Sequence, residues 1–186
     1  MPSQLIQYVE VHDNLTLYDK LKASMPQATE NGITQRDKLA NSIVLLSQGI
    51  PELQLGQSFL RTKGGNDNSY NSPDSVNGID WDRLSTYKAA DNYVKGLISL
   101  RKSIPALHAD SYEAINAAVT PLATSNGLVA FQVKDKSGTY IVAFNGGNTS
   151  VKLDGLAKGK YTVLVAHGSV DDKAVATLAG HCGNHN

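Results

Sequence analysis

Tyr8-Val9-Glu10-Val11-His12-Asp13-Asn14 is the stretch of this sequence that decides the predicted fold. It completes a strand pattern over residues 5–11, ends in a polar cluster, and leads into a predicted helix over residues 15–25, which Pro26 ends. Enzymes built as barrels of alternating strands and helices keep their active sites where a strand gives way to a helix. The stretch therefore predicts a β/α unit that carries functional groups at the carboxyl end of its strand.

A second strand and further helices are predicted downstream. We expect Thr34 to cap a helix whose apolar residues recur at helical spacing up to Leu46. Gly49 lies where a left-handed helix end is usual, and Pro51 prevents the helix from continuing. The following segments are predicted as a short strand over 50–55, a long loop over 56–82, and a helix over 86–103.

The pattern changes near Leu107, from alternating strands and helices to short strands separated by Gly, Asn and Asp. The runs 128–133 and 139–144 flank a turn sequence and predict a β-hairpin. Two more strands are predicted over 151–153 and 161–165. Residues 108–186 therefore predict a separate antiparallel β-sandwich domain after an α/β region over residues 1–107.

The composition excludes several classes of function. Lys and Arg number 17, as do Asp and Glu, and no basic cluster is present that would neutralise nucleic-acid phosphates. No apolar run is long enough to cross a bilayer. The single Cys182 cannot form an internal disulfide, and residues 1–4 lack the features of a signal peptide, so a secreted and a cytoplasmic location both stay open.

The sequence does not predict a cofactor or a metal site. The oxygen-bearing residues of the long loop lack the spacing of an EF-hand, so a structural calcium ion has no support from ligand spacing. His181, Cys182 and His185 could take a zinc ion, but a fourth ligand is not evident. We expect these three residues to be part of an irregular chain end.

The long loop carries an unusual run of residues. This run supports the functional interpretation of residues 8–14. The matching segments are Gly49-Ile50-Pro51, Gly56-Gln57, Phe59-Leu60-Arg61-Thr62-Lys63-Gly64-Gly65-Asn66-Asp67-Asn68-Ser69-Tyr70-Asn71-Ser72-Pro73-Asp74-Ser75 and Ile79-Asp80-Trp81. Together with residues 8–14 they resemble type I pullulanases, debranching enzymes of the alpha-amylase superfamily of glycoside hydrolases. The resemblance covers roughly residues 5–150.

The resemblance implies a carboxy-terminal fragment. Residues 1–107 would be the last two β/α units of a (β/α)8 TIM barrel, and residues 108–186 the β-sandwich domain that follows it. The family's nucleophilic Asp and acid/base Glu lie on earlier strands, before residue 1 of this chain. We therefore expect the isolated polypeptide to be inactive.

The resemblance also implies an activity, which is retaining hydrolysis of α-1,6-glucosidic linkages in pullulan, glycogen or amylopectin. Asp13 would be the third catalytic carboxylate, which stabilises positive charge on the sugar ring in the transition state. His12 would donate or accept a hydrogen bond with a glucose hydroxyl. The alternatives are that Asp13 or Asn14 caps the following helix, that His12 is a satisfied strand-end histidine, and that Glu10 serves strand packing.

The loop supplies two further candidates for binding an α-glucan. Asn68 and Tyr70 match positions that line the substrate groove of the family, although an Asn-rich turn could satisfy its own backbone instead. We expect Arg61 to form a structural ion pair rather than to bind substrate. Trp81 is predicted to be a buried anchor of the loop, with a sugar platform as the alternative.

The chain departs from the family pattern at several positions. Val11 stands where the family commonly has Ser, Tyr18 where it has Trp, and Ser58 where it has Glu, which removes a carboxylate expected near the site. Residues 180–186 do not resemble the closing strand of the family. Two other functions stay open, an α-1,4-acting or dual-activity hydrolase and a non-catalytic carbohydrate-binding or structural module in the β half.

Overall fold

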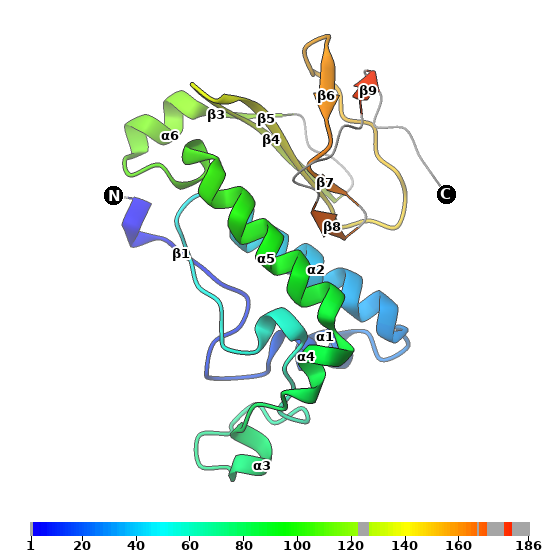
Figure 1. Ribbon diagram of the computed structural model, residues 1–186. Coiled ribbons are helices and arrows are strands. Elements are labelled where there is room, and N and C mark those ends of the chain that lie inside the picture. Colours follow the sequence, from blue (N-terminus) through cyan, green and yellow to red (C-terminus); the bar gives the residue numbers. More distant parts are fainter. Residues whose placement is uncertain (1, 123–126, 167, 171–176, 180–186) are drawn as a thin grey trace.

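Two long helices, α2 (Glu30–Leu46) and α5 (Lys88–Ser103), pack against each other through the centre of the molecule (Figure 1). The computed structural model describes residues 2–122, 127–166, 168–170 and 177–179. At one end of the helix pair lies a β-sheet, and at the other end lies the loop that connects the helices. None of the helices in these residues is long and apolar enough to span a membrane.

The amino-terminal segment forms a short β/α unit. It comprises η1 (Pro2–Gln4), β1 (Ile6–Gln7) and α1 (Leu17–Ser24). Strand β1 pairs in parallel with β2 (Ile50–Pro51), with Ile6 opposite Ile50. The predicted strand over 5–11 is wrong in length, because the pairing ends with the bond from the Glu52 amide to the Gln7 carbonyl (2.9 Å).

Threonine side chains begin both α1 and α2. The hydroxyl oxygen of Thr16 accepts the amide of Asp19 (3.1 Å), and that of Thr29 accepts the amide of Gly32 (3.1 Å). The prediction that Thr34 caps the second helix is wrong. Its hydroxyl lies inside α2 and donates to the carbonyl of Glu30, because the earlier Thr29 offers the same capping chemistry.

The segment between β2 and α5 contains short helices rather than a plain loop. These are η2 (Gln57–Phe59), α3 (Asp74–Asn77) and α4 (Asp82–Thr86). Gly49 has the expected left-handed conformation, with φ 97°. Leu60 also has a positive φ of 57°, which is unusual for a branched residue, and Arg83 donates two hydrogen bonds to its carbonyl.

The carboxy-terminal half contains the predicted hairpin. Strands β4 (Leu128–Asp135) and β5 (Gly138–Asn145) pair antiparallel, with Val133 opposite Tyr140, and β3 (Val119–Pro121) extends the sheet. The remaining elements are η3 (Pro105–His108), α6 (Tyr112–Ala118), β6 (Lys160–Thr162), β7 (Val165–Ala166), β8 (Ser169–Val170) and β9 (Thr177–Ala179). Strand β6 pairs with β9, and β7 pairs with β8.

Three features of this half differ from the prediction. Helix α6 was not expected, although Ser111 caps it by accepting the amide of Ala114 (3.1 Å). Residues 151–153 do not form a strand, because no neighbouring segment in the described residues pairs with them. The predicted strand over 161–165 is divided between β6 and β7, which pair with different partners.

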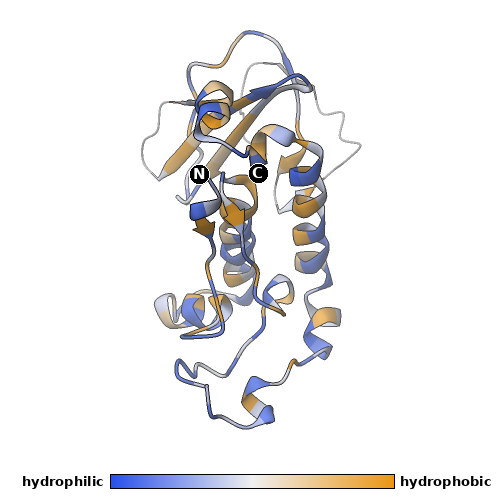
Figure 2. Ribbon diagram, turned by 90° about the vertical axis from the view of Figure 1, so that its left-hand side faces the viewer, coloured by the Kyte–Doolittle hydropathy of each residue, from blue (hydrophilic) through white to orange (hydrophobic). Residues whose placement is uncertain are grey.

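One hydrophobic core lies between the helix pair and the three-stranded sheet. Figure 2 shows apolar segments along the strands and on the helices that face them. The buried members of the core come from α2, α5, η3, β4 and β5 and include Leu45, Leu97, Leu107, Val133 and Phe144. The core therefore ties together residues from both sides of the boundary predicted near Leu107.

Candidate functional site

A cavity of about 310 Å³ lies between the turn that follows β1 and the loop that follows η2. The turn contributes His12 and Asp13, and the loop contributes Tyr70. The complete lining consists of His12, Asp13, Gln54, Arg61, Lys63, Ser69, Tyr70 and Asn77. Three of the four residues predicted to act on substrate thus line one polar cavity.

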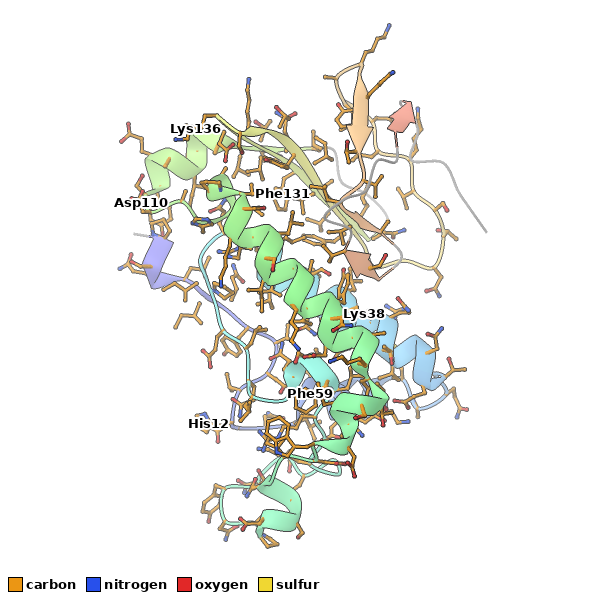
Figure 3. The ribbon with its side chains drawn as sticks, in the orientation of Figure 1. His12, Lys38, Phe59, Asp110, Phe131 and Lys136 are labelled. Carbon is orange, nitrogen blue, oxygen red and sulfur yellow. The ribbon has the colours of Figure 1, made fainter. Side chains whose placement is uncertain are left out.

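His12 and Asp13 face solvent at the end of the turn. Figure 3 shows His12 projecting away from the helices. The side chains of His12 and Asp13 are 83% and 78% exposed, and His12 Nε2 lies 3.5 Å from Asp13 Oδ2. Asp13 is not the cap of α1, because Thr16 is, and Asn14 Oδ1 accepts the amide of the next residue, Leu15 (2.7 Å). The Asp13 carboxylate is therefore available to a ligand.

Glu10 lies buried beneath this turn and supports the start of α1. Its side chain accepts the amide of Leu17 through Oε2 (2.5 Å), while Oε1 has no hydrogen-bond partner in the described residues. Burial raises the pKa of Glu10 to about 7, although the Leu17 hydrogen bond and the nearby charges of Arg61 and Lys63 lower it. Glu10 was expected to serve strand packing, and its capping role was missed.

Lys63 connects the two sides of the cavity. Its Nζ donates to the carbonyl of His12 (2.8 Å) and to the hydroxyl of Ser69 (2.8 Å), and its amide donates to Asp19 Oδ2 (2.8 Å). Only 7% of Lys63 is exposed. The sequence analysis did not single out this residue, because a lysine among loop residues gives no signal of burial.

Tyr70 and Asn68 occupy different positions on the loop. Tyr70 is 81% exposed and lines the cavity, whereas Asn68 is exposed outside the lining. The Asn68 amide donates to Asn66 Oδ1 (2.9 Å), and Asn77 Nδ2 donates to the carbonyl of Ser69 (2.7 Å). Part of the Asn-rich loop therefore satisfies its own backbone, which is the alternative that the sequence left open.

Two expectations for this loop are wrong. Arg61 donates to the carbonyls of Leu55 (3.4 Å) and Asn77 (2.6 Å) rather than forming an ion pair in the described part of the chain. Trp81 is 59% exposed and packs against the ring of Phe59 at 5.7 Å between centroids. Phe59, against which Trp81 packs, is the buried ring of this pair at 5% exposed.

Ser58, which replaces a Glu of the family, lies outside the cavity lining. Its hydroxyl donates to Asp91 Oδ1 on α5 (2.9 Å), so this position packs against the helix pair. A Glu at this position would meet the carboxylate of Asp91. The replacement therefore leaves the set of groups that line the cavity unchanged.

A buried chain of polar groups connects α2 to the cavity. Asp37 Oδ1 accepts Asn41 Nδ2 (2.9 Å), Asn41 Oδ1 accepts Gln57 Nε2 (2.7 Å), and Gln57 Oε1 accepts the amide of Gln54 (3.1 Å). Burial, assisted by the charge of Glu10, raises the pKa of Asp37 to about 8. This chain of hydrogen bonds fixes Gln54, which lines the cavity.

A metal centre is not indicated by these residues. Within residues 2–122, 127–166, 168–170 and 177–179, no group of three or more His, Cys, Asp or Glu side chains could hold a metal ion. The candidate zinc ligands His181, Cys182 and His185 lie outside the described residues.

Comparisons with known proteins show what this chain is similar to. No family model matches the chain. It is 44% identical over 134 residues to a pullulanase of Bacillus subtilis, an alignment that covers 72% of this chain and 19% of that protein. The chain is homologous to part of the pullulanases.

Solved structures agree with that assignment. The pullulanase from Bacillus acidopullulyticus matches 97% of this chain with 38% identity and a TM-score of 0.91, and 23% of that structure is covered. The type I pullulanase from Bacillus subtilis in complex with maltose also matches 97% with a TM-score of 0.91, at 35% identity and 26% coverage of that structure. The pullulanase homologue therefore has the mixed helix and sheet arrangement of these enzymes, over about a quarter of their length or less.

Proposed function

We propose that this chain is part of an enzyme that hydrolyses α-1,6-glucosidic linkages in pullulan, glycogen or amylopectin with retention. The observation that carries the proposal is the cavity that His12, Asp13 and Tyr70 share in a chain 44% identical to a pullulanase. The type I pullulanase structure with bound maltose supports an α-glucan as the ligand.

We further propose a division of the chain into two parts. Residues 1–107 form the last two β/α units of a (β/α)8 barrel, and residues 108–186 form an antiparallel β-sandwich. The parallel pairing of β1 with β2 and the antiparallel sheet of β3, β4 and β5 support this division. A parallel pair normally has further strands beside it and helices over its faces, which agrees with a barrel of more strands.

In this proposal Asp13 is the carboxylate that stabilises the transition state. Its exposed oxygens can hold sugar hydroxyls and oppose the positive charge that develops on the ring. His12 forms a hydrogen bond with a glucose hydroxyl, Tyr70 stacks on a sugar face, and Asn68 contacts a hydroxyl at the outer side of the loop. The resemblance to type I pullulanases assigns the nucleophile and the acid/base to earlier strands of the barrel, so we expect the isolated chain not to hydrolyse α-glucan.

The test is a chimera of the Bacillus subtilis pullulanase in which this chain replaces the segment that aligns with it. We expect the chimera to release reducing ends from pullulan in preference to amylose. The substitution Asp13→Asn should lower kcat about 100-fold or more, because one group that opposes transition-state charge is worth that much. Asp154→Asn is the matched control, since Asp154 is also exposed and paired, with Lys152 at 2.7 Å.

Other outcomes of the chimera experiment would contradict the proposed linkage or the proposed role of Asp13. An α-1,4-acting enzyme would give a chimera that cleaves amylose and leaves pullulan intact. Full activity of the Asp13→Asn chimera would refute the catalytic role of Asp13. The melting temperature of the chimera should not change with Asp13→Asn, because substitutions at exposed side chains usually alter stability by less than about 0.5 kcal/mol.

A further inference from the structure

Lys63 makes contact with both walls of the cavity through a single buried ammonium group. The His12 carbonyl that it binds belongs to the peptide that joins His12 to Asp13, and the Ser69 hydroxyl directly precedes Tyr70. Both distances are 2.8 Å, within the range of strong charge-assisted hydrogen bonds. The Lys63 side chain thus restrains both walls of the cavity, at His12 and at Ser69.

The main chain at Lys63 is itself held by a rigid element. Asp19 of α1 is 6% exposed and accepts two hydrogen bonds from this segment, from the Lys63 amide (2.8 Å) and from the Thr62 hydroxyl (2.5 Å). The amide of Asp19 is in turn bound by the Thr16 cap. The Lys63 side chain therefore extends from a fixed point, and its contacts can set distances within the cavity.

We propose that Lys63 is a positioning residue that sets the separation between Asp13 and Tyr70, an inference that rests on the proposed function of these two residues. Its ammonium holds the peptide before Asp13 on one side and the residue before Tyr70 on the other. Asp13 acts at the reacting ring and Tyr70 on a neighbouring sugar face, so the two contacts of Lys63 affect different kinetic parameters.

Lysine suits this role for a chemical reason. An ammonium is a compact charge with three donors that point in different directions, so it can reach two acceptors from separate segments. A guanidinium is planar and longer, and its donors lie in one plane on separate nitrogens, so it would not keep the two acceptors at the spacing that one ammonium nitrogen sets. Lys63→Arg is therefore not expected to restore the function that Lys63→Met removes.

Kinetics of the chimera test the inference. Lys63→Met removes both contacts, so it should lower kcat for pullulan about 100-fold and also raise KM, because misplacement of a reacting group by about 1 Å has a cost of that order. Ser69→Ala leaves the His12 contact intact and should raise KM while kcat stays near the parent value. Lys22→Met is the matched control, since Lys22 is 48% exposed and pairs with Glu30 at 3.5 Å.

A purely structural lysine would give another pattern. Both variants would then lose melting temperature and the fraction of active enzyme, with kcat and KM per active molecule unchanged. That pattern, or equal effects of Lys63→Met and Ser69→Ala on kcat and KM, overturns the inference. Because Ser69→Ala removes only one hydroxyl, it supplies the KM measurement even where Lys63→Met fails to fold.

Amide resonances of the 186-residue chain separate this inference from the proposed function. Lys63→Met should shift the main-chain amide resonances of Asp13 and Tyr70, Ser69→Ala should shift that of Tyr70 alone, and Lys22→Met should shift neither. These shifts with an inactive parent chimera would refute the proposed function while supporting the geometric role of Lys63. An active parent chimera that tolerates Lys63→Met would refute the role of Lys63 alone.

Discussion

Glu10 lies in an environment that its neighbours in the sequence do not predict. It lies in an apolar strand pattern, yet its carboxyl group caps α1 and is 4% exposed. Burial is the main reason why its pKa is raised to about 7, from an ordinary value of 4.5. A carboxyl group with such a pKa changes its charge near neutral pH, directly beneath the His12–Asp13 turn.

The raised pKa of Glu10 predicts a pH dependence of stability. Between pH 4.5 and about 7 the folded chain holds a proton on Glu10 that the unfolded chain has released. The free energy of unfolding therefore falls as the pH rises through this window. Glu10→Gln keeps an acceptor for the Leu17 amide and removes the charge. The melting temperature of the variant minus that of the parent chain should therefore increase as the pH rises from 5 to 8.

The measurement is thermal unfolding of both chains across that pH range. Glu52→Gln is the control, because it removes one carboxylate from an exposed position of the chain. Asp37, with a pKa raised to about 8 by burial and by the charge of Glu10, contributes in the same direction. Because Glu10→Gln removes that charge, the pKa of Asp37 should be raised less in the variant, which adds to the difference between the two chains. A difference in melting temperature that is independent of pH would contradict the account of Glu10.

At the scale of elements, the carboxyl end of α2 depends on a side chain from α5. Arg101 is 7% exposed and donates from Nη1 to the carbonyls of Leu45 (2.8 Å) and Ser47 (2.6 Å), and from Nη2 to that of Gly49 (2.8 Å). The last carbonyls of a helix lack partners within it, and a cation there also interacts favourably with the helix dipole.

We therefore expect Arg101→Met to destabilise the chain by about 2–4 kcal/mol, since buried carbonyls lose charged donors and are left without partners. The measurement is urea unfolding, with the slope of the transition compared between variants. Lys102→Met is the control, because Lys102 is adjacent on α5 and exposed. Equal effects of the two substitutions would show that the contacts of Arg101 do not hold the end of α2.

At the scale of the whole molecule, the shared core couples the two halves of the chain. Leu97 of α5 and Val133 of β4 are both fully buried and belong to the same cluster. Leu107, at the proposed domain boundary, is 1% exposed inside that cluster. A boundary that runs through a common core does not allow either side to lose its structure without exposing apolar surface of the other.

The shared core predicts one cooperative unfolding transition. Fluorescence of the single Trp81, in the first half, and far-UV circular dichroism, which reports on both halves, should give coincident denaturation curves. Leu97→Ala should shift both curves together and cost about 2–5 kcal/mol. Two separate transitions would instead indicate that residues 1–107 and 108–186 fold independently.

The local elements of this fold could be predicted from the sequence, because their signals act over a few residues. Apolar spacing predicted α5 and all but the first turn of α2, Pro26 predicted the end of the helix that contains α1, and Gly49 with Pro51 predicted that α2 ends before them. Alternating residues around a turn predicted the hairpin of β4 and β5. The resemblance to type I pullulanases, rather than a local pattern, pointed to His12, Asp13 and Tyr70, which line one cavity.

Tertiary structure decided the features that depend on residues far apart in the sequence. The strand over 5–11 is reduced to β1 because a strand requires a partner along its length, and the parallel pairing with β2 ends at Pro51. Phe59 is buried and Trp81 packs against it from the solvent side, an arrangement that depends on how the loop folds back onto itself. Lys63 could not be recognised as the link across the cavity, since its acceptors on His12 and Ser69 meet only when the chain is folded. Periodicity and capping act between neighbours in the sequence, whereas burial and long-range hydrogen bonds exist only between neighbours in space.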